Sequence, residues 1–322
     1  MTPHFRRLIR RLASLLLCAC AAADNPLVLP DFHIARSESI PENKIKVVPD
    51  TDEYTPVLHH NGWQEPAPLS YVINTAGLED SPYITADGKT LFFFFTPDAE
   101  VPAEQQFNDG ATGIYRSRMI DSVWTKPERI PLTKNGEAAL DGCPIFSGGT
   151  LWFCSIRERN FRTIDFWQAD WVGTEWRNLR NAGKQLNDLI GIGEMHISTD
   201  GRSIFFHKPT QNNANLDVYI INKQDDEWGD PIPIDNVNSE EDDSRPALSP
   251  DETELWFTRT HEGTPAIYRS IFSKNAWQTL ELVISRFAGE PTIDRDGNIY
   301  FTHHFYKDGK MIEADIYIAI KK

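Results

Sequence analysis

The sequence predicts an all-β protein built from one repeated unit. The unit is a short strand, a tight turn and a second, more apolar strand, and its five copies begin at Pro82, Pro144, Met195, Pro246 and Pro291. Four copies carry Asp-Gly or Gly-Gly at the turn, which is a strong hairpin signal because such turns need positive φ. The copies recur about every 50 residues, and this period with four strands per unit is typical of a β-propeller blade.

Two more strand patterns follow each hairpin and complete the unit. The third strand carries a tyrosine or tryptophan in every unit, at Tyr115, Trp167, Tyr219, Tyr268 and Tyr317. The fourth strand begins with a tryptophan, at Trp124, Trp176, Trp228 and Trp277. A proline often follows three residues later, and proline suits an outer edge strand because the side that lacks an N–H faces water.

The last unit lacks a fourth strand, because the chain ends at Lys322 soon after Tyr317. Residues 62–66 have the fourth-strand pattern and stand before the first hairpin. Donating them to the last unit closes the ring and removes exposed sheet edges. We therefore expect residues 59–322 to form a single five-bladed β-propeller of four-stranded blades, closed by an N-terminal strand donated to the last blade.

The run from Pro246 to Asp251, together with the Ile-Tyr pairs of the third strands, resembles the WD40-like repeat called PD40. PD40 repeats occur in exported propellers of the TolB type, and the resemblance covers roughly residues 60–320. It implies a propeller and an exported protein. It does not select a function, because PD40 blades occur in binding scaffolds, peptidases and sugar enzymes.

Residues 1–23 read as a signal peptide, with four arginines before a short apolar stretch that is too short to cross a bilayer. Two modes of processing stay open. Residues 17–20 resemble a lipobox in which Cys20 is lipidated, whereas the alanines at 21–23 suit ordinary cleavage. Both predict export, to the periplasm or to the outer membrane. Residues 24–58 are rich in proline and charge, and we expect a linker there.

Cys143 and Cys154 are the cysteines that remain after such processing. If Gly148-Gly149 is a two-residue turn, residue 147 pairs with 150 and Cys143 faces Cys154 across the hairpin. A disulfide is then expected in an exported protein. Two buried thiols are the alternative.

The formal net charge of −15 argues against a nucleic-acid partner, because phosphates would be repelled. The sequence also has no Gly-x-Ser-x-Gly elbow, Walker loop or dinucleotide fingerprint. These absences disfavour a serine hydrolase, an NTPase and a dehydrogenase.

Acidic residues stand just before the repeated position that begins each hairpin. Three lie three residues before it and two lie one residue before it: Glu79, Asp141, Asp243, Glu194 and Glu290. In an extended strand these positions project to the same side. Polar residues near the same positions and at the exits of the second strands are expected to face them at the tunnel mouth: Asp80, Arg245, His196, Arg157, His207, Arg259 and His303.

Two functions follow from this acidic face, and both stay open. The first is a non-catalytic module that binds a glycan, a peptide or an envelope protein, and that meets the membrane only through its lipid anchor. The second is a glycoside hydrolase in which Asp80 or Glu79 is the base, Asp141 tunes pKa values and Glu194 is the acid. A central divalent cation of unknown identity fits the second function. An internal salt-bridge ring that closes the tunnel mouth is the structural alternative.

Overall fold

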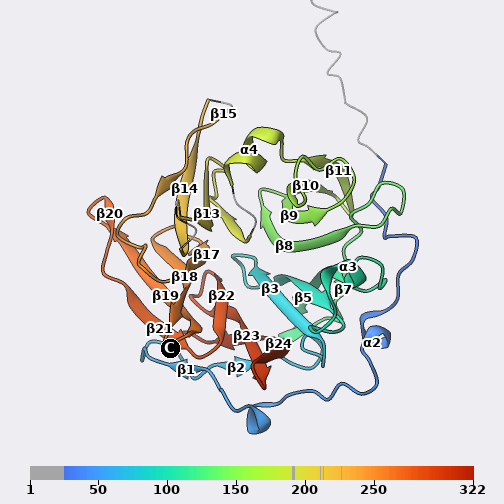
Figure 1. The fold of residues 1–322 in the computed structure, drawn as a ribbon, viewed down its shortest axis with the longest axis horizontal. Coiled ribbons are helices and arrows are strands. Elements are labelled where there is room, and N and C mark those ends of the chain that lie inside the picture. Colours follow the sequence, from blue (N-terminus) through green and yellow to red (C-terminus); the bar gives the residue numbers. More distant parts are fainter. Residues whose placement is uncertain (1–24, 191–192, 211, 213, 226) are drawn as a thin grey trace, which may run out of the picture.

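The computed structural model in Figure 1 describes residues 25–190, 193–210, 212, 214–225 and 227–322. Over these described residues it confirms the all-β class, with 24 strands and a few short helices: α2 (Arg36–Ser39), η1 (Pro49–Thr51), α3 (Ala103–Gln106) and α4 (Lys184–Leu189). The sheets lie around a common centre (Figure 1). Among the described residues, no helix combines the length and the apolar character that a membrane span requires. The predicted signal peptide and Cys20 lie outside the described residues.

The second and third units of the sequence each form a separate antiparallel sheet. The first of these sheets contains β8 (Leu140–Ser147), β9 (Thr150–Ile156), β10 (Asp165–Val172) and β11 (Glu175–Asn181). The second contains β12 (Met195–Ile197), β13 (Ser203–Pro209), β14 (Leu216–Gln224), β15 (Glu227–Trp228) and β16 (Ile232–Pro233). In the second sheet β15 and β16 both pair with β14, so the predicted fourth strand is split into two short pieces.

The fourth unit forms a six-stranded sheet that includes a strand from the N-terminal region. Its own strands are β17 (Asp243–Leu248), β18 (Glu254–His261), β19 (Thr264–Ser273), β20 (Ala276–Trp277) and β21 (Glu281–Ser285). The added strand is β1 (Val57–Leu58), which pairs with β21.

The first and last units share a nine-stranded sheet. The first unit supplies β3 (Leu78–Ile84), β4 (Thr90–Thr96), β5 (Gly113–Ile120), β6 (Val123–Trp124) and β7 (Glu128–Arg129). The last supplies β22 (Ala288–Ile293), β23 (Ile299–Lys307) and β24 (Lys310–Ala319), with β2 (Ala67–Pro68) from the N-terminal region. A single parallel pair, Ala314 with Leu78, joins β24 to β3. All five predicted hairpins are antiparallel strand pairs.

In the hairpin turns an aspartate side-chain oxygen accepts hydrogen bonds from the turn, in place of a backbone carbonyl oxygen. In the fourth unit Ser249 Oγ donates to Asp251 Oδ1 at 2.6 Å, and the N–H of Thr253 donates to the same oxygen at 3.2 Å. The first unit repeats this with Thr85 and Asp87. Short polar side chains that bond their own backbone two residues on are typical of tight turns. The Ser-Pro-Asp run is thus explained by local structure.

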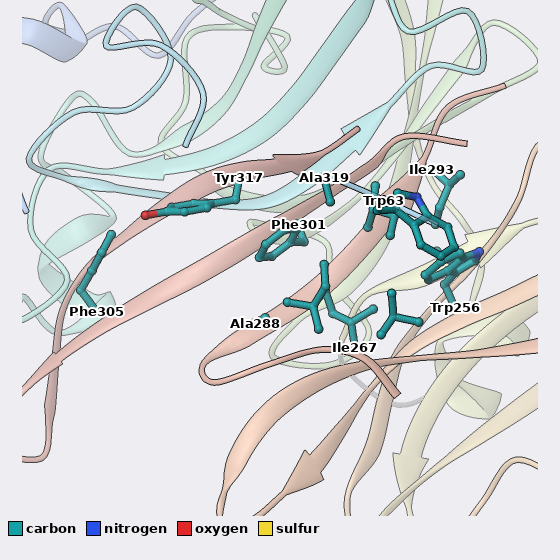
Figure 2. Packing of buried hydrophobic residues seen from close by; sticks show 13 residues of the cluster. Trp63, Trp256, Ile267, Ala288, Ile293, Phe301, Phe305, Tyr317 and Ala319 are labelled. Atoms are coloured by element: carbon teal, nitrogen blue, oxygen red, sulfur yellow. The ribbon is translucent and has the colours of Figure 1, made fainter. Parts of the chain in front are cut away.

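The N-terminal region lies beside the last sheet, as predicted. Ala67 and Pro68 pair with Ile318 and Tyr317, and Trp63 forms an isolated bridge with Lys321. Figure 2 shows the Trp63 ring packed beside Trp256, at a centroid distance of 5.6 Å. The paired strand begins at Ala67, just beyond the predicted residues 62–66.

Residues 25–58 differ from the expected linker, because they run along the outside of the sheets (Figure 1). Leu27 is buried, and its N–H donates to the carbonyl oxygen of Trp176 at 2.8 Å. Arg36 and Lys46 each contact a buried carboxyl group in the sheets, and Asp52 contacts the buried ring of His303. The segment is therefore an integral part of the folded body.

Replacing Trp63 tests how much the N-terminal region that precedes the first hairpin contributes to stability. Its side chain is 1% exposed, and its indole N–H donates to the carbonyl oxygen of Gly297 at 2.8 Å. We expect Trp63→Ala to lower the free energy of unfolding by about 3–5 kcal/mol, the usual cost of deleting a buried aromatic side chain. Urea unfolding measures the change. A loss below about 1 kcal/mol would contradict the role of Trp63 in the core.

Candidate functional site

The five repeated positions meet around one small cavity, which we call the narrow cavity. Each unit contributes three consecutive residues to it: 81–83, 143–145, 194–196, 245–247 and 290–292. Its volume is about 40 Å³, which leaves room for a few water molecules at most. The sequence repeat thus identified a set of residues that the fold brings together.

A β-bulge recurs where four of the first strands reach this cavity. Ser81, Cys143, Arg245 and Glu290 have φ angles between 49° and 57°, and the strand register shifts at the same places. A bulge inserts one extra residue, so side chains beyond it change sides. The expectation that positions three and one before the repeat share a side is therefore wrong. In β3, Asp80 is opposite Phe94 and Tyr83 is opposite Phe92. Phe92 and Phe94 are two residues apart and so project to the same side of β4. Asp80, and not Glu79, therefore lies on the same side of the sheet as Tyr83.

The acids three residues before the repeat form separate ion pairs, each with one arginine. The pairs are Glu79 with Arg36 at 3.1 Å, Asp141 with Arg157 at 2.5 Å and Asp243 with Arg259 at 2.6 Å. Each guanidinium also donates to a backbone carbonyl oxygen, that of Ile73, Leu132 or Val237. These carboxylates and arginines are therefore engaged within the fold as separate pairs, and Asp141 does not line the narrow cavity.

Sequence reasoning missed Arg36. Arg157 and Arg259 stand 13 residues after the repeated position, where the first unit has Phe95. Arg36 reaches in from the N-terminal region, and its guanidinium carbon lies 5.4 Å from the centre of the Phe95 ring. Burial raises the pKa of Glu79 to about 7, although Arg36 and Thr75 act to lower it. No signal in the sequence linked an arginine of the expected linker to this acid.

The acids one residue before the repeat surround Arg245, and we call Glu194, Arg245 and Glu290 the inner cluster. Arg245 Nε lies 3.4 Å from Glu194 Oε2 and 2.7 Å from Glu290 Oε1. Ser81 N–H and Thr302 Oγ each donate to Glu290 Oε2 at 2.9 Å. Ser81 Oγ donates to Glu194 Oε1 at 3.1 Å. Glu290 Oε2 thus accepts two hydrogen bonds, whereas Oε1 is in ion-pair contact with Arg245, whose Nε makes no hydrogen bond to a described residue.

Burial decides the protonation of the inner cluster. Burial and the neighbouring Asp80 carboxylate raise the pKa of Glu290 to about 7, against the opposing effect of Arg245. Burial acts to lower the pKa of Arg245, but Glu194 and Glu290 raise it above its usual range. Arg245 is therefore always charged, and its charge is shared between two carboxyl groups.

The predicted histidines occupy three different places. His207 lies beside the inner cluster, where its Nδ1 accepts the N–H of Arg245 at 3.2 Å. His196 lines the narrow cavity. Burial lowers the pKa of both to about 4, so both rings are neutral at pH 7. His303 is buried on the other side of β23, 2.9 Å from Asp52 of the N-terminal region, whereas its neighbour His304 faces Asp80 at 3.8 Å.

The two cysteines are not opposite each other in the register of β8 and β9. The bulge at Cys143 shifts the register by one residue, so Cys154 opposes Gly142. Both thiols are free in the structure. A hydrogen bond with Cys154, together with burial, raises the pKa of Cys143 well above its usual value. The predicted strand register at Cys143 is therefore wrong by one residue, whereas the disulfide between Cys143 and Cys154 stays a prediction.

A second cavity was not predicted. This wide cavity has a volume of about 840 Å³ and is lined by the turns of the hairpins as well as by the ends of the first strands. Tyr83, His196 and Thr292 line both cavities, so the two are neighbours along the centre of the molecule. Its walls are mainly apolar, with Phe146, Leu248 and Ile293 among them, and Asp87 and Asp251 lie at the turns.

Comparisons with known proteins found structural similarity alone. No family model matches the chain, and no curated protein matches it. TolB from Acinetobacter baumannii aligns with a TM-score of 0.38 and 17% identity, covering 72% of this chain and 51% of that chain. An endo-arabinase from Bacteroides thetaiotaomicron aligns with a TM-score of 0.45 and 14% identity, covering 77% and 96%.

A thermostable family-43 glycoside hydrolase aligns with a TM-score of 0.46 and 12% identity, covering 76% of this chain and 91% of that chain. At such values these similarities assign neither a family nor a function.

The buried pair of Arg36 and Glu79 gives the first prediction for this site. We expect Arg36→Met to lower the free energy of unfolding by about 3–5 kcal/mol, because it leaves a buried carboxyl group without its partner. The double variant Arg36→Met/Glu79→Gln should recover part of this loss in urea unfolding. Equal losses in the single and double variants would contradict the pairing.

His196 gives a prediction for pH. Its pKa is 6.5 in the unfolded chain and about 4 in the folded protein, so the unfolded chain binds more protons between these values. Stability should therefore fall as the pH falls from about 6.5 towards 4. In His196→Gln that contribution is absent, and urea midpoints measured from pH 7 to pH 4.5 should fall less steeply than in the natural protein. The same dependence of the urea midpoint on pH in both proteins would contradict this prediction.

Proposed function

We propose that this chain is an exported five-bladed β-propeller of the PD40 kind that binds a ligand without transforming it. Five antiparallel hairpins around one centre support the blade count, and the pairing of β2 with β24 supports closure by the N-terminal region. The arginines and apolar stretch of residues 1–23 support export. Cys20 would then anchor the protein to the outer membrane if it is lipidated, and otherwise the protein is periplasmic.

The contrast between the two cavities carries the proposal. At the narrow cavity the carboxyl groups are already bonded to Arg245, Ser81 and Thr302, and the free volume is about 40 Å³. The wide cavity has about 840 Å³, within the range of roughly 300–1,000 Å³ that small ligands occupy. We therefore place the ligand in the wide cavity, at the hairpin-turn end, instead of at the acidic face expected from the sequence.

The lining of the wide cavity indicates the kind of ligand. Phe146, Leu248 and Ile293 offer apolar contact, and the neutral ring of His196 offers one donor and one acceptor deep inside. Hydrogen bonds from Thr85 and Ser249 lower the pKa of Asp87 and Asp251, so the turns carry negative charge. Arg295 also lines the cavity, so the lining carries two negative charges and one positive charge. A glycan or a peptide that is neutral or positively charged fits this lining better than an anion does.

Glycoside hydrolysis is the second candidate, because Glu290 is a buried acid with a pKa of about 7 beside Asp80. A raised pKa of this kind is what a general acid needs. The predicted roles of Asp80, Asp141 and Glu194 depend on their meeting, yet Asp141 is engaged with Arg157 and Ser155. Release of reducing ends from a glycan panel, abolished in Glu290→Gln, would replace the binding proposal by this one.

A variant that fills the wide cavity tests the binding proposal. Thr199 is exposed and lines this cavity, and Thr174 is equally exposed in the turn between β10 and β11. Purified protein is screened against glycan and peptide arrays, and the affinity of each hit is measured by calorimetry. We expect Thr199→Trp to weaken binding at least about tenfold, since tryptophan occupies the ligand volume. Thr174→Trp should bind as the natural protein does.

Two results would contradict the proposal. One is unchanged binding by Thr199→Trp, which would place the ligand elsewhere. The other is turnover of any bound glycan, which would make the protein an enzyme.

A further inference from the structure

Three side chains from different strands meet beside the inner cluster: Asp80 of β3, Glu290 of β22 and His304 of β23. One potential ligand atom of each lies within 4.8 Å of those of the other two, and within the described residues this is the one group of three or more His, Cys, Asp or Glu with that property. Asp80 and His304 are partly buried, and Glu290 is 5% exposed. The binding function proposed above does not use this group.

The atoms that face one another are all hydrogen-bond acceptors. His304 Nδ1 lies 3.4 Å from the carbonyl oxygen of Phe287, and a ring nitrogen that faces a carbonyl oxygen carries the proton. His304 Nε2 then presents a lone pair to Asp80 Oδ1, 3.8 Å away. Asp80 Oδ1 is itself buried without a hydrogen-bond partner. Two acceptors held face to face repel each other unless a positive charge lies between them.

The side chains around this group also contain more carboxyl groups than positive charges. Asp80, Glu194 and Glu290 carry three negative charges when ionised, and Arg245 supplies one positive charge to them. The neighbouring His207 ring is neutral. Carboxyl groups therefore outnumber their cationic partner three to one in this partly buried place, and a cation bound there would reduce the imbalance.

We propose that Asp80, Glu290 and His304 bind a divalent transition-metal ion such as Zn²⁺. An imidazole nitrogen with two carboxylate oxygens suits zinc and its first-row neighbours, whereas calcium and magnesium prefer oxygen ligands alone. The Phe287 carbonyl oxygen fixes the ring of His304, and Ser81 and Thr302 fix the carboxylate of Glu290. Such supporting bonds are typical around metal ligands.

Titration of metal into untagged, EDTA-treated full-length protein tests the site. We expect one Zn²⁺ per chain by calorimetry, with much weaker binding of Ca²⁺. Asp80→Asn and His304→Gln should each weaken Zn²⁺ binding at least about tenfold, the loss typical of damage to a metal site. Asp230→Asn and His33→Gln are matched controls, because Asp230 is exposed between β15 and β16 and His33 is exposed in the N-terminal region. The controls should bind as the natural protein does.

Thermal unfolding gives a second readout that does not depend on calorimetry. A metal that binds the folded state alone raises the unfolding temperature, so Zn²⁺ should raise it in the natural protein and in both controls but not in Asp80→Asn. Absence of Zn²⁺ binding to the natural protein would overturn the proposal. Undiminished binding by both ligand variants, or equal affinity for Ca²⁺, would overturn it as well.

Discussion

The arrangement of this molecule depends on a β-bulge that recurs at the inner end of its strands. Ser81, Cys143, Arg245 and Glu290 are left-handed residues that are not glycine, and such a conformation costs about 1–2 kcal/mol each. Nearby hydrogen bonds offset that cost, since the N–H groups of Ser81 and Glu290 have buried side-chain acceptors. The bulge decides that Asp80 and Glu290, and not Glu79, lie near the central cluster.

The carboxyl groups consequently fall into two sets with different roles. The outer set is paired one to one with arginines that also bond backbone oxygens, as Asp243 is with Arg259, and these pairs hold the fold together. The inner set shares one arginine among several carboxyl groups. It is crowded and short of positive charge, and the volume beside it is small. The wide cavity at the other end has the opposite character, since its walls are mainly apolar and its volume is large.

The hairpins and the first-strand residues could be predicted from the sequence because both are local or repeated. Turn signals act over a few residues, and a repeat that recurs five times places equivalent residues at equivalent positions around a centre. The side on which each acid lies could not be predicted, because it depends on the bulges. A proline follows each of the four bulged residues, but proline also occurs in edge strands and at strand starts and so does not by itself mark a bulge. The bulge at Cys143 moved Cys154 opposite Gly142. The contacts of Arg36, Lys46 and Asp52 with the sheets could not be predicted either, because these residues stand in a segment whose composition resembles a linker.

By itself the sequence determined that this is an all-β repeat protein, that its N-terminal region reaches the last sheet, and that the repeated first-strand positions meet around one centre. Local turn chemistry and the spacing of the repeats are sufficient for these, since they depend on neighbours along the chain. Only the tertiary structure decided which acid takes which partner and where the larger cavity opens. Those outcomes depend on a one-residue shift of register and on contacts between segments hundreds of residues apart, such as Asp52 with His303.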